Sequence, residues 1–339
     1  MVKGVTTSII TVAVLMGSLV ACGESGNDNK SDSAEMEEQT DGSVNDVSGN
    51  DNKSDSAEME EQIDGPQKIA FSELFGDIFM MDVDVTRVRR ITNEHWNDSP
   101  SWSADGSQIV FSSDRDGDWE IFVMDERGKN VRQLTNNDDY DGVPHWSADG
   151  SQIVFSSDRD GDSGIFVMDA DGVNVRQITS SEHVSSPSFS PDGKQIAFFS
   201  MSPNYKYGTD MIWDEDVYSN IFVVDADGMN VQQLTGFSSC FADSPMWSPD
   251  GKQIVFSRIC FEGQGDAQDE RSDILVMDAD GANLTTATEN GSYPVWTSDG
   301  RQIAFTSYRY GEAEIFLMDA DGSNVISTTV KGVVSDYWP

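Results

Sequence analysis

Carboxylates dominate the residues of this chain that could do chemistry. The 339 residues include 60 Asp and Glu against 21 Lys and Arg, a formal net charge of −39. Ca²⁺ takes oxygen ligands, so aspartates brought to one place could hold it. Four aspartates each stand just before a recurring short apolar segment, and they form the first candidate metal site: Asp98, Asp141, Asp243 and Asp336.

A second candidate calcium site lies in two copies of one loop. Asp114, Asp116 and Asp118 have the spacing D-x-D-G-D, and Asp158, Asp160 and Asp162 repeat it. The glycine comes too early for an EF-hand loop, and no closing glutamate follows. A plain hairpin loop is the alternative reading, and the sequence leaves both open.

Other catalytic patterns are missing from the sequence. It has no GxSxG elbow and no GxGxxG or GxxxxGK[ST] phosphate loop. The three histidines, His95, His145 and His183, show no three-ligand spacing, so isolated surface histidines are expected. We therefore predict no catalytic residue and no cofactor, with Ca²⁺ as the one candidate ligand ion.

The elements that must position these residues form a repeat. Ser99–Thr135 returns almost unchanged as Val143–Thr179, and in altered form three more times. Each copy holds four short apolar segments separated by Asp-Gly turns, which predicts strands joined in hairpins. Ile109-Val110-Phe111 is apolar at adjacent positions, so both faces of its sheet should be buried. A period of about forty residues with four strands indicates a propeller blade.

Counting the copies predicts an all-β, six-bladed β-propeller of four-stranded antiparallel blades. Complete units begin at Ser99, Val143, Ser186, Ser244 and Tyr293. A partial unit, Lys68–Thr92, lacks the first strand, and Val333–Pro339 resembles that missing strand. One blade should therefore be shared between the two ends of the chain. Large aromatics at one equivalent position should pack between blades: Trp102, Trp146, Phe189, Trp247 and Trp296.

The N-terminal segment has a targeting pattern. A short apolar run ends in Leu-Val-Ala-Cys at Cys22, which resembles the lipobox of bacterial lipoproteins. The resemblance implies a signal peptide over residues 1–21 and lipidation of Cys22; an ordinary secretory signal is the alternative. Residues 22–65 form an acidic stretch with an internal duplication, typical of a disordered tether. The propeller should occupy residues 66–339.

The repeat motif itself resembles the TolB-type propeller, a WD40-like repeat. The matching residues read P-x-[FW]-S-P-D-G-K-Q-I-x-F in Ser186–Phe198 and Ser244–Phe256, followed by Ile221–Val231 and Ile274–Leu284. The resemblance implies the fold and a location in the bacterial cell envelope. In this chain a tether stands where the family has an α/β domain, and Gly23 after Cys22 favours the outer membrane.

Loops that vary on a constant scaffold are the place to look for binding. One insertion, Met201–Ser219, interleaves aromatics with charges, and we predict that it binds a partner. The candidate residues are Tyr205, Lys206, Tyr207, Trp213, Asp214, Asp216 and Tyr218. A surface loop that packs its own aromatics is the alternative. Cys240 and Cys260 fall in two loops on the same face, and in an oxidising envelope compartment we predict a disulfide between them. Two buried free thiols are the alternative.

These features favour a lipid-anchored, non-enzymatic scaffold that binds an envelope protein or peptide through the inserted-loop face. The negative charge favours a basic partner and argues against nucleic acid. Contact with a membrane is expected through the lipid anchor only, and the protein is expected to be a monomer. Two alternatives stay open: divalent-cation-dependent saccharide binding or oligouronide lyase activity, and a purely structural spacer.

Overall fold

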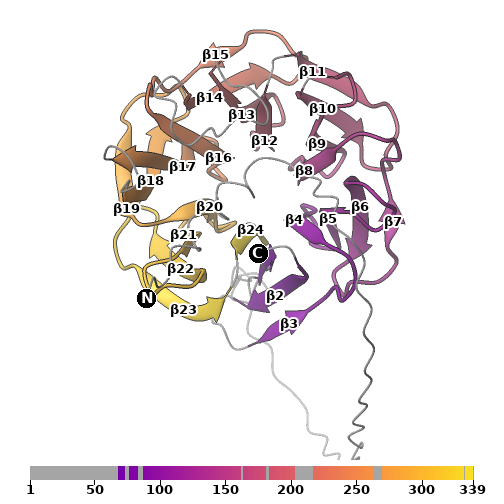
Figure 1. Cartoon of the computed structure of the whole chain (residues 1–339), viewed down its shortest axis with the longest axis horizontal. Helices are drawn as coiled ribbons and strands as arrows, with labels where there is room; N and C mark the ends of the chain where they lie inside the picture. Colours follow the sequence, from indigo (N-terminus) through magenta and orange to yellow (C-terminus); the bar gives the residue numbers. More distant parts are fainter. Residues whose placement is uncertain are drawn as a thin grey trace, which may run out of the picture. The chain divides into compact units, whose positions relative to one another are not determined.

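The computed structural model describes residues 68–72, 76–82, 87–161, 163–180, 183–202, 217–262, 269–331 and 333–338. Within these ranges the chain forms six four-stranded sheets, each antiparallel and each one blade of a ring (Figure 1). The predicted all-β, six-bladed propeller is confirmed. No helix in the described part of the chain is long and apolar enough to cross a membrane. The predicted signal peptide, Cys22 and the tether lie outside the described residues.

The strands follow the repeat closely. Blade 1 contains β24 (Val333–Trp338), β1 (Lys68–Ser72), β2 (Ile78–Asp82) and β3 (Val88–Arg90). Blade 2 contains β4 (Asn97–Trp102), β5 (Gln108–Ser113), β6 (Glu120–Asp125) and β7 (Arg132–Gln133). Blade 3 contains β8 (Asp141–Trp146), β9 (Gln152–Ser157), β10 (Gly164–Asp169) and β11 (Arg176–Ser180).

The second half of the ring repeats the pattern with longer strands in one blade. Blade 4 contains β12 (Val184–Phe189), β13 (Gln195–Met201), β14 (Ser219–Asp225) and β15 (Gln232–Gln233). Blade 5 contains β16 (Cys240–Trp247), β17 (Gln253–Glu262), β18 (Asp269–Asp278) and β19 (Thr285–Glu289). Blade 6 contains β20 (Ser292–Trp296), β21 (Gln302–Ser307), β22 (Glu314–Asp319) and β23 (Ile326–Lys331).

The ring closes through blade 1, which takes strands from both ends of the described chain. β24 pairs antiparallel with β1, from Lys68 opposite Trp338 to Ser72 opposite Val333. β24 also contacts β20 of blade 6 and β4 of blade 2, so the six innermost strands form an unbroken circle (Figure 1). The predicted shared blade is therefore confirmed. Pairing with β24 covers the edge of β1 that would otherwise be unpaired.

Alternation along the middle strands builds six separate cores, one in each seam between blades. In β5, Ile109 and Phe111 pack in the seam with blade 1, and Val110 packs in the seam with blade 3. All three side chains are fully buried. Successive side chains of a strand point to opposite faces, so an apolar run supplies both neighbouring seams. The same division holds around the ring.

The recurring aromatics lie in these seams, as the repeat predicted. Trp102 packs against blade 1 and Trp146 against blade 2, each only 4% exposed. Phe189, Trp247 and Trp296 do the same in the following seams. Each large ring fills the space between two sheets, which is a packing role.

Glycines in the turns between third and fourth strands fit each blade to the one before. Gly172 has φ +91°, and a Cβ atom there would lie 2.7 Å from the carbonyl oxygen of Leu134 in blade 2. Gly128 and Gly322 meet the preceding blade even more closely. Only glycine combines this backbone conformation with so close an approach. These turns therefore set the spacing of neighbouring blades.

Two glycines of blade 3 separate the effect of spacing from that of conformation. Gly161 has the same φ of +91° as Gly172, but nothing lies within 4 Å of a Cβ built on it. Gly161→Ala should lower the free energy of unfolding by about 1–2 kcal/mol, because alanine is strained in the left-handed conformation. Gly172→Ala should cost at least about 2 kcal/mol more, because blades 2 and 3 must also separate. Denaturant unfolding of both variants measures the difference, and equal losses would contradict the proposed role of Gly172.

Candidate functional site

The two faces of the ring differ in how their residues are used. We call the face with the turns between strands one and two, and between strands three and four, the first face. On it Asp149 accepts hydrogen bonds from the Ser147 hydroxyl (2.7 Å) and the Ser151 backbone N–H (3.0 Å). These bonds lower the pKa of Asp149 to about 2. Gly150 completes the turn at φ +68°. The same Ser/Thr-to-Asp bond recurs in four other blades.

The second set of first-face turns uses its aspartates in the same way. Asp169 accepts a bond from the side-chain amide of Asn174 (2.7 Å), and Asn174 has φ +55°. Asparagine tolerates the left-handed region better than most residues, which explains its recurrence at this place. The same bond from an asparagine amide to an aspartate joins four other pairs: Asn130 and Asp125, Asn230 and Asp225, Asn283 and Asp278, and Asn324 and Asp319. The repeated aspartates of the first face are therefore occupied by the turns.

The innermost strands carry a repeated bulge just before a proline. The residue before the proline has a positive φ, between +50° and +55°, at Ser99, Val143, Ser186, Ser244 and Tyr293. Two of these residues reach the preceding blade through their backbone N–H: Val143 donates to Ser112 Oγ (3.1 Å) and Tyr293 to Ser257 Oγ (2.8 Å). A non-glycine residue in this region is strained unless its surroundings hold it. The hydrogen bonds between blades help to stabilise this backbone conformation.

The four aspartates predicted to share a metal site lie at three different levels of the inner strands. Asp98 and Asp243 pair with the equivalent residues Ser112 and Ser257, but in blades 2 and 5, which are not neighbours. Asp141 pairs with Ser157, so it lies one residue nearer the start of its strand than Asp98 does in β4.

Asp336 pairs with Ala70 of β1. Ala70 is equivalent to Val110 of β5, which pairs with Ser101, so Asp336 lies at the level of Ser101 in blade 2. The bulges and the separate register of β24 set these levels, and the described residues do not gather the four at one level. The structure describes no side chain at Asp336.

Asp243 is buried, and only one of its two carboxylate oxygens has hydrogen-bond partners. Its side chain is 4% exposed, and Oδ1 accepts bonds from Ser244 Oγ (3.0 Å) and Ser186 Oγ (3.3 Å). Oδ2 has no hydrogen-bond partner. Burial raises the pKa of Asp243 to about 6, although the serine bonds work against the rise. Burial likewise raises the pKa of Asp98, which accepts a bond from Ser72 Oγ (2.7 Å) in blade 1.

Arginines cap three blades on the opposite face, which we call the second face. Arg115 lies over the rings of Phe111 and Phe122, with 4.6 Å to the nearer centroid. Its Nε donates to Ser113 Oγ and its Nη2 to Asn97 Oδ1. Arg159 and Arg309 repeat this arrangement in blades 3 and 6. Sequence analysis missed these caps, although the recurring arginine two residues after a serine was a readable signal.

Most of the predicted partner-binding residues lie outside the described residues. These are Tyr205, Lys206, Tyr207, Trp213, Asp214 and Asp216. Tyr218 is described: it is half-buried, and its carbonyl accepts a bond from the Ser202 N–H (2.7 Å) at the base of the insertion.

The second and third strands of blade 5 are longer than those of its neighbours. β17 and β18 have ten residues each, against seven for β13 and β14 of blade 4 and six for β21 and β22 of blade 6. Cys240 and Cys260, expected in loops, instead face each other on β16 and β17 and are joined by a disulfide, with Cα atoms 4.4 Å apart. The longer strands extend the ladder past the point where the other blades end, which brings the two cysteines into register.

A buried ion-pair group braces the same extension. Asp273, fully buried at the start of the blade's core, is paired with Arg258 and with Arg271 (3.1 Å). Arg271 also contacts Glu289 (3.0 Å). Both charged oxygens of Asp273 therefore have cationic partners.

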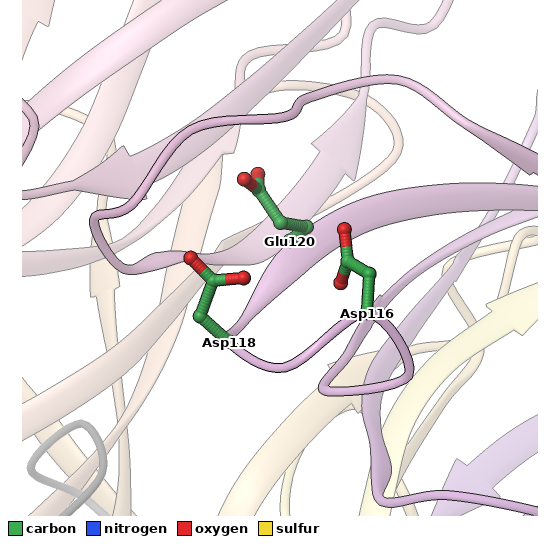
Figure 2. Close-up of side chains that lie close together, drawn as sticks. All are labelled: Asp116, Asp118 and Glu120. Atoms are coloured by element: carbon green, nitrogen blue, oxygen red, sulfur yellow. The ribbon is translucent and has the colours of Figure 1, made fainter.

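The loop between β5 and β6 brings three carboxylates together. Ligand oxygens of Asp116, Asp118 and Glu120 all lie within 4.8 Å of one another, and Figure 2 shows the three side chains rising from one short segment toward a common space. Glu120 is fully buried, and burial raises its pKa to about 8, with neighbouring Asp141 adding to the rise. Asp114, predicted to join Asp116 and Asp118, instead bonds the N–H of Trp96. Sequence analysis missed Glu120.

Comparison with known proteins agrees with the fold. Residues 67–217 match the family model of the TolB beta propeller domain. An uncharacterized protein of Agrobacterium fabrum is 34% identical over 186 residues, which cover 54% of this chain and 47% of that protein. The chain spans less than half the length of the curated relatives it matches.

Two solved structures show how far the likeness in shape extends. TolB from Acinetobacter baumannii is 18% identical, with a TM-score of 0.64 over 81% of this chain and 67% of that one. An oligogalacturonate lyase in complex with manganese is 12% identical, with a TM-score of 0.52 over 75% of this chain and 70% of that one. At such identities the likeness concerns the fold alone.

Replacing Asp243 should change how stability depends on pH. The native carboxyl keeps its proton up to about pH 6, whereas the unfolded chain releases it near 3.8, so wild-type stability falls as pH rises through this window. Between pH 4 and pH 8, the free energy of unfolding of the wild type should fall by about 2–3 kcal/mol relative to that of Asp243→Asn. Denaturant unfolding at several pH values measures this.

Asp250→Asn is the matched control on the first face. Bonds from the Lys252 and Ser248 side chains lower the pKa of Asp250 to about 2, so here the wild type should gain on the variant as pH rises between 2 and 4. The exposed position makes this effect smaller. A wild-type-to-D243N difference that does not change with pH would show that Asp243 ionises without penalty.

Proposed function

We propose that this TolB-like propeller is a non-enzymatic scaffold of the bacterial cell envelope that binds a basic protein or peptide through its second face. The observation that carries the proposal is the braced extension of blade 5. A repeated scaffold has no structural need for one blade with ten-residue strands, a disulfide and a buried ion-pair group. Rigid projections of this kind reduce the ordering cost of binding.

Exposed aromatic side chains support the second face as the binding surface. The side chain of Tyr310, in the loop between β21 and β22, is 70% exposed, and that of Trp96, in the connection before β4, is 51% exposed. Tyrosine and tryptophan are enriched at the energetic centres of protein interfaces. β13 ends at Met201 and β14 begins at Ser219 on this face as well, on either side of the predicted partner-binding residues.

The net charge of −39 specifies the chemistry of the partner. A strongly acidic surface attracts basic proteins at long range and repels nucleic acid. In this proposal Cys22 carries the lipid, residues 22–65 hold the propeller off the outer membrane as a tether, and the protein acts as a monomer. The TolB-like fold supports a role in the envelope.

A saccharide-binding or oligouronide lyase activity is the alternative function. Its support is the likeness in fold to a manganese-bound oligogalacturonate lyase and the carboxylate group at Asp116, Asp118 and Glu120. Turnover of oligogalacturonate by the full chain with added Mn²⁺ or Ca²⁺ would favour this alternative over the scaffold.

Chemical crosslinking in envelope preparations, followed by mass spectrometry, tests the scaffold. A second-face variant, Trp96→Ala with Tyr310→Ala, should lower recovery of the crosslinked partner at least about tenfold. The matched first-face variant, Val173→Ala with Met229→Ala, changes side chains that are 51% and 63% exposed and should leave recovery unchanged. Partner loss in the first-face variant alone would contradict the assignment of the binding face.

A further inference from the structure

We infer that the seam between blades 2 and 3 holds a Ca²⁺ site on the second face, with Asp116, Asp118 and Glu120 as carboxylate ligands and Asp141 beside them. This site differs from the inner-strand set that the sequence suggested. It keeps Asp116 and Asp118 of the second set, and it has Glu120 in place of Asp114. It also lies apart from the extension of blade 5 that carries the proposed partner binding.

A comparison among blades isolates what is unusual about Glu120. The residue just before the apolar core of the third strand is Asp77, Glu120, Gly164, Asn220, Asp273 and Glu314 in blades 1 to 6. Two of these acids, Glu120 and Asp273, have 0% exposure. Asp273 is neutralised by two arginines, and the less buried Asp77 pairs with Arg90 (3.2 Å). Among the described ion pairs, Glu120 has no cationic partner.

The contacts of Glu120 leave one oxygen unused. Oε1 accepts a bond from the backbone N–H of Asn137, whereas Oε2 is buried without a hydrogen-bond partner. A buried carboxylate in this condition is strongly destabilising unless a proton or a cation neutralises it.

Asp141 supplies a second buried oxygen from the next blade. It begins β8, has 0% exposure, and lies against the Glu120 carboxyl, where its contact adds to the rise in the pKa of Glu120. Its Oδ2 accepts bonds from Arg159 Nη2 (2.6 Å) and Asn137 Nδ2 (2.7 Å), but its Oδ1 has no hydrogen-bond partner. Arg159 neutralises one of the four carboxylates gathered in this seam. A bound cation would neutralise the remaining charge and would take up the oxygens that have no hydrogen-bond partner.

The arrangement of oxygens fits Ca²⁺. Ligand atoms of Asp116, Asp118 and Glu120 lie within 4.8 Å of one another, the separation available to ligands at about 2.3–2.6 Å from a common centre. Mg²⁺ needs shorter distances and near-octahedral geometry, and it retains most of its water. Gln133 Nε2 donates to Asp116 Oδ2, which orients that carboxylate. Figure 2 shows the side chains of all three ligands on the same side of the loop.

Blade 3 provides a natural comparison for the loop. Its sequence repeats Arg-Asp-Gly-Asp, but Gly164 occupies the position of Glu120. The described residues of that loop form no comparable group of ligand atoms. Asp160 of blade 3 is therefore the matched control for an acidic residue in the same kind of loop without the third ligand.

Thermal unfolding of the full chain with Ca²⁺ alone tests the inference. Saturating Ca²⁺ should raise the wild-type midpoint by about 5 °C or more over the midpoint in EDTA. Glu120→Gln and Asp118→Asn should each lose most of this rise, and Asp160→Asn should keep it. In EDTA above about pH 8, where the Glu120 carboxyl loses its proton, Glu120→Gln should melt above the wild type, because it removes an uncompensated buried charge. This reversal of order between EDTA and Ca²⁺ is the signature of a ligand and not of a structural role.

Terbium luminescence locates the bound ion independently of stability. Tb³⁺ can replace Ca²⁺ and is excited by a nearby tryptophan, and Trp119 lies between two of the ligands in the sequence. Trp119→Phe should abolish most of the sensitised signal, whereas Trp96→Phe should leave most of it. Equal Ca²⁺ responses in the wild type and Glu120→Gln would overturn the site and show general binding to an acidic surface. Sensitised emission unaffected by Trp119→Phe would overturn it as well.

Discussion

Ring closure through the pairing of β24 with β1 is the constraint on which the rest of the structure depends. The six cores lie between blades, not within them, so each apolar strand needs a neighbour on both sides. Blade 1 contributes to two of these cores through Ile69 and Ala70. Without β24, the inner edge of β1 would be unpaired, and the seams on both sides of blade 1 would lose their support. Each buried apolar side chain contributes about 1.5–3 kcal/mol, so an open seam would be costly.

Ring closure also accounts for the structural contacts that the most repeated residues make. The Asp-Gly turns use their carboxylates within the turn, and the turn glycines approach the blade before them. Pre-proline residues such as Val143 reach back to a serine of that blade. Contacts of these kinds join neighbouring blades at several steps around the ring. Both sites that we propose lie where the repeat changes, at the extension of blade 5 and at the buried Glu120.

Much of the fold was predictable from the sequence because the blades repeat a physical pattern. Adjacent apolar residues such as Ile109 and Val110 indicated sheets buried on both faces, and Trp102 and its equivalents indicated packing between blades. The candidate sites were less predictable because they depend on register. Asp98 and Asp141 resemble each other in the sequence, yet they differ by one residue in strand pairing. Glu120 stands out only when the arginines of Asp273 and the position of Asp141 across the seam are known.

The thermal midpoint of the chain without Val333–Pro339 tests the central claim most directly. Loss of β24 should lower the midpoint by at least about 10 °C, because two seams and one strand ladder lose their support. A synthetic peptide of the deleted sequence, added in excess, should restore part of the loss by pairing with β1. A midpoint unchanged by the deletion would contradict the account, because the ring would then hold together without the strand that closes it.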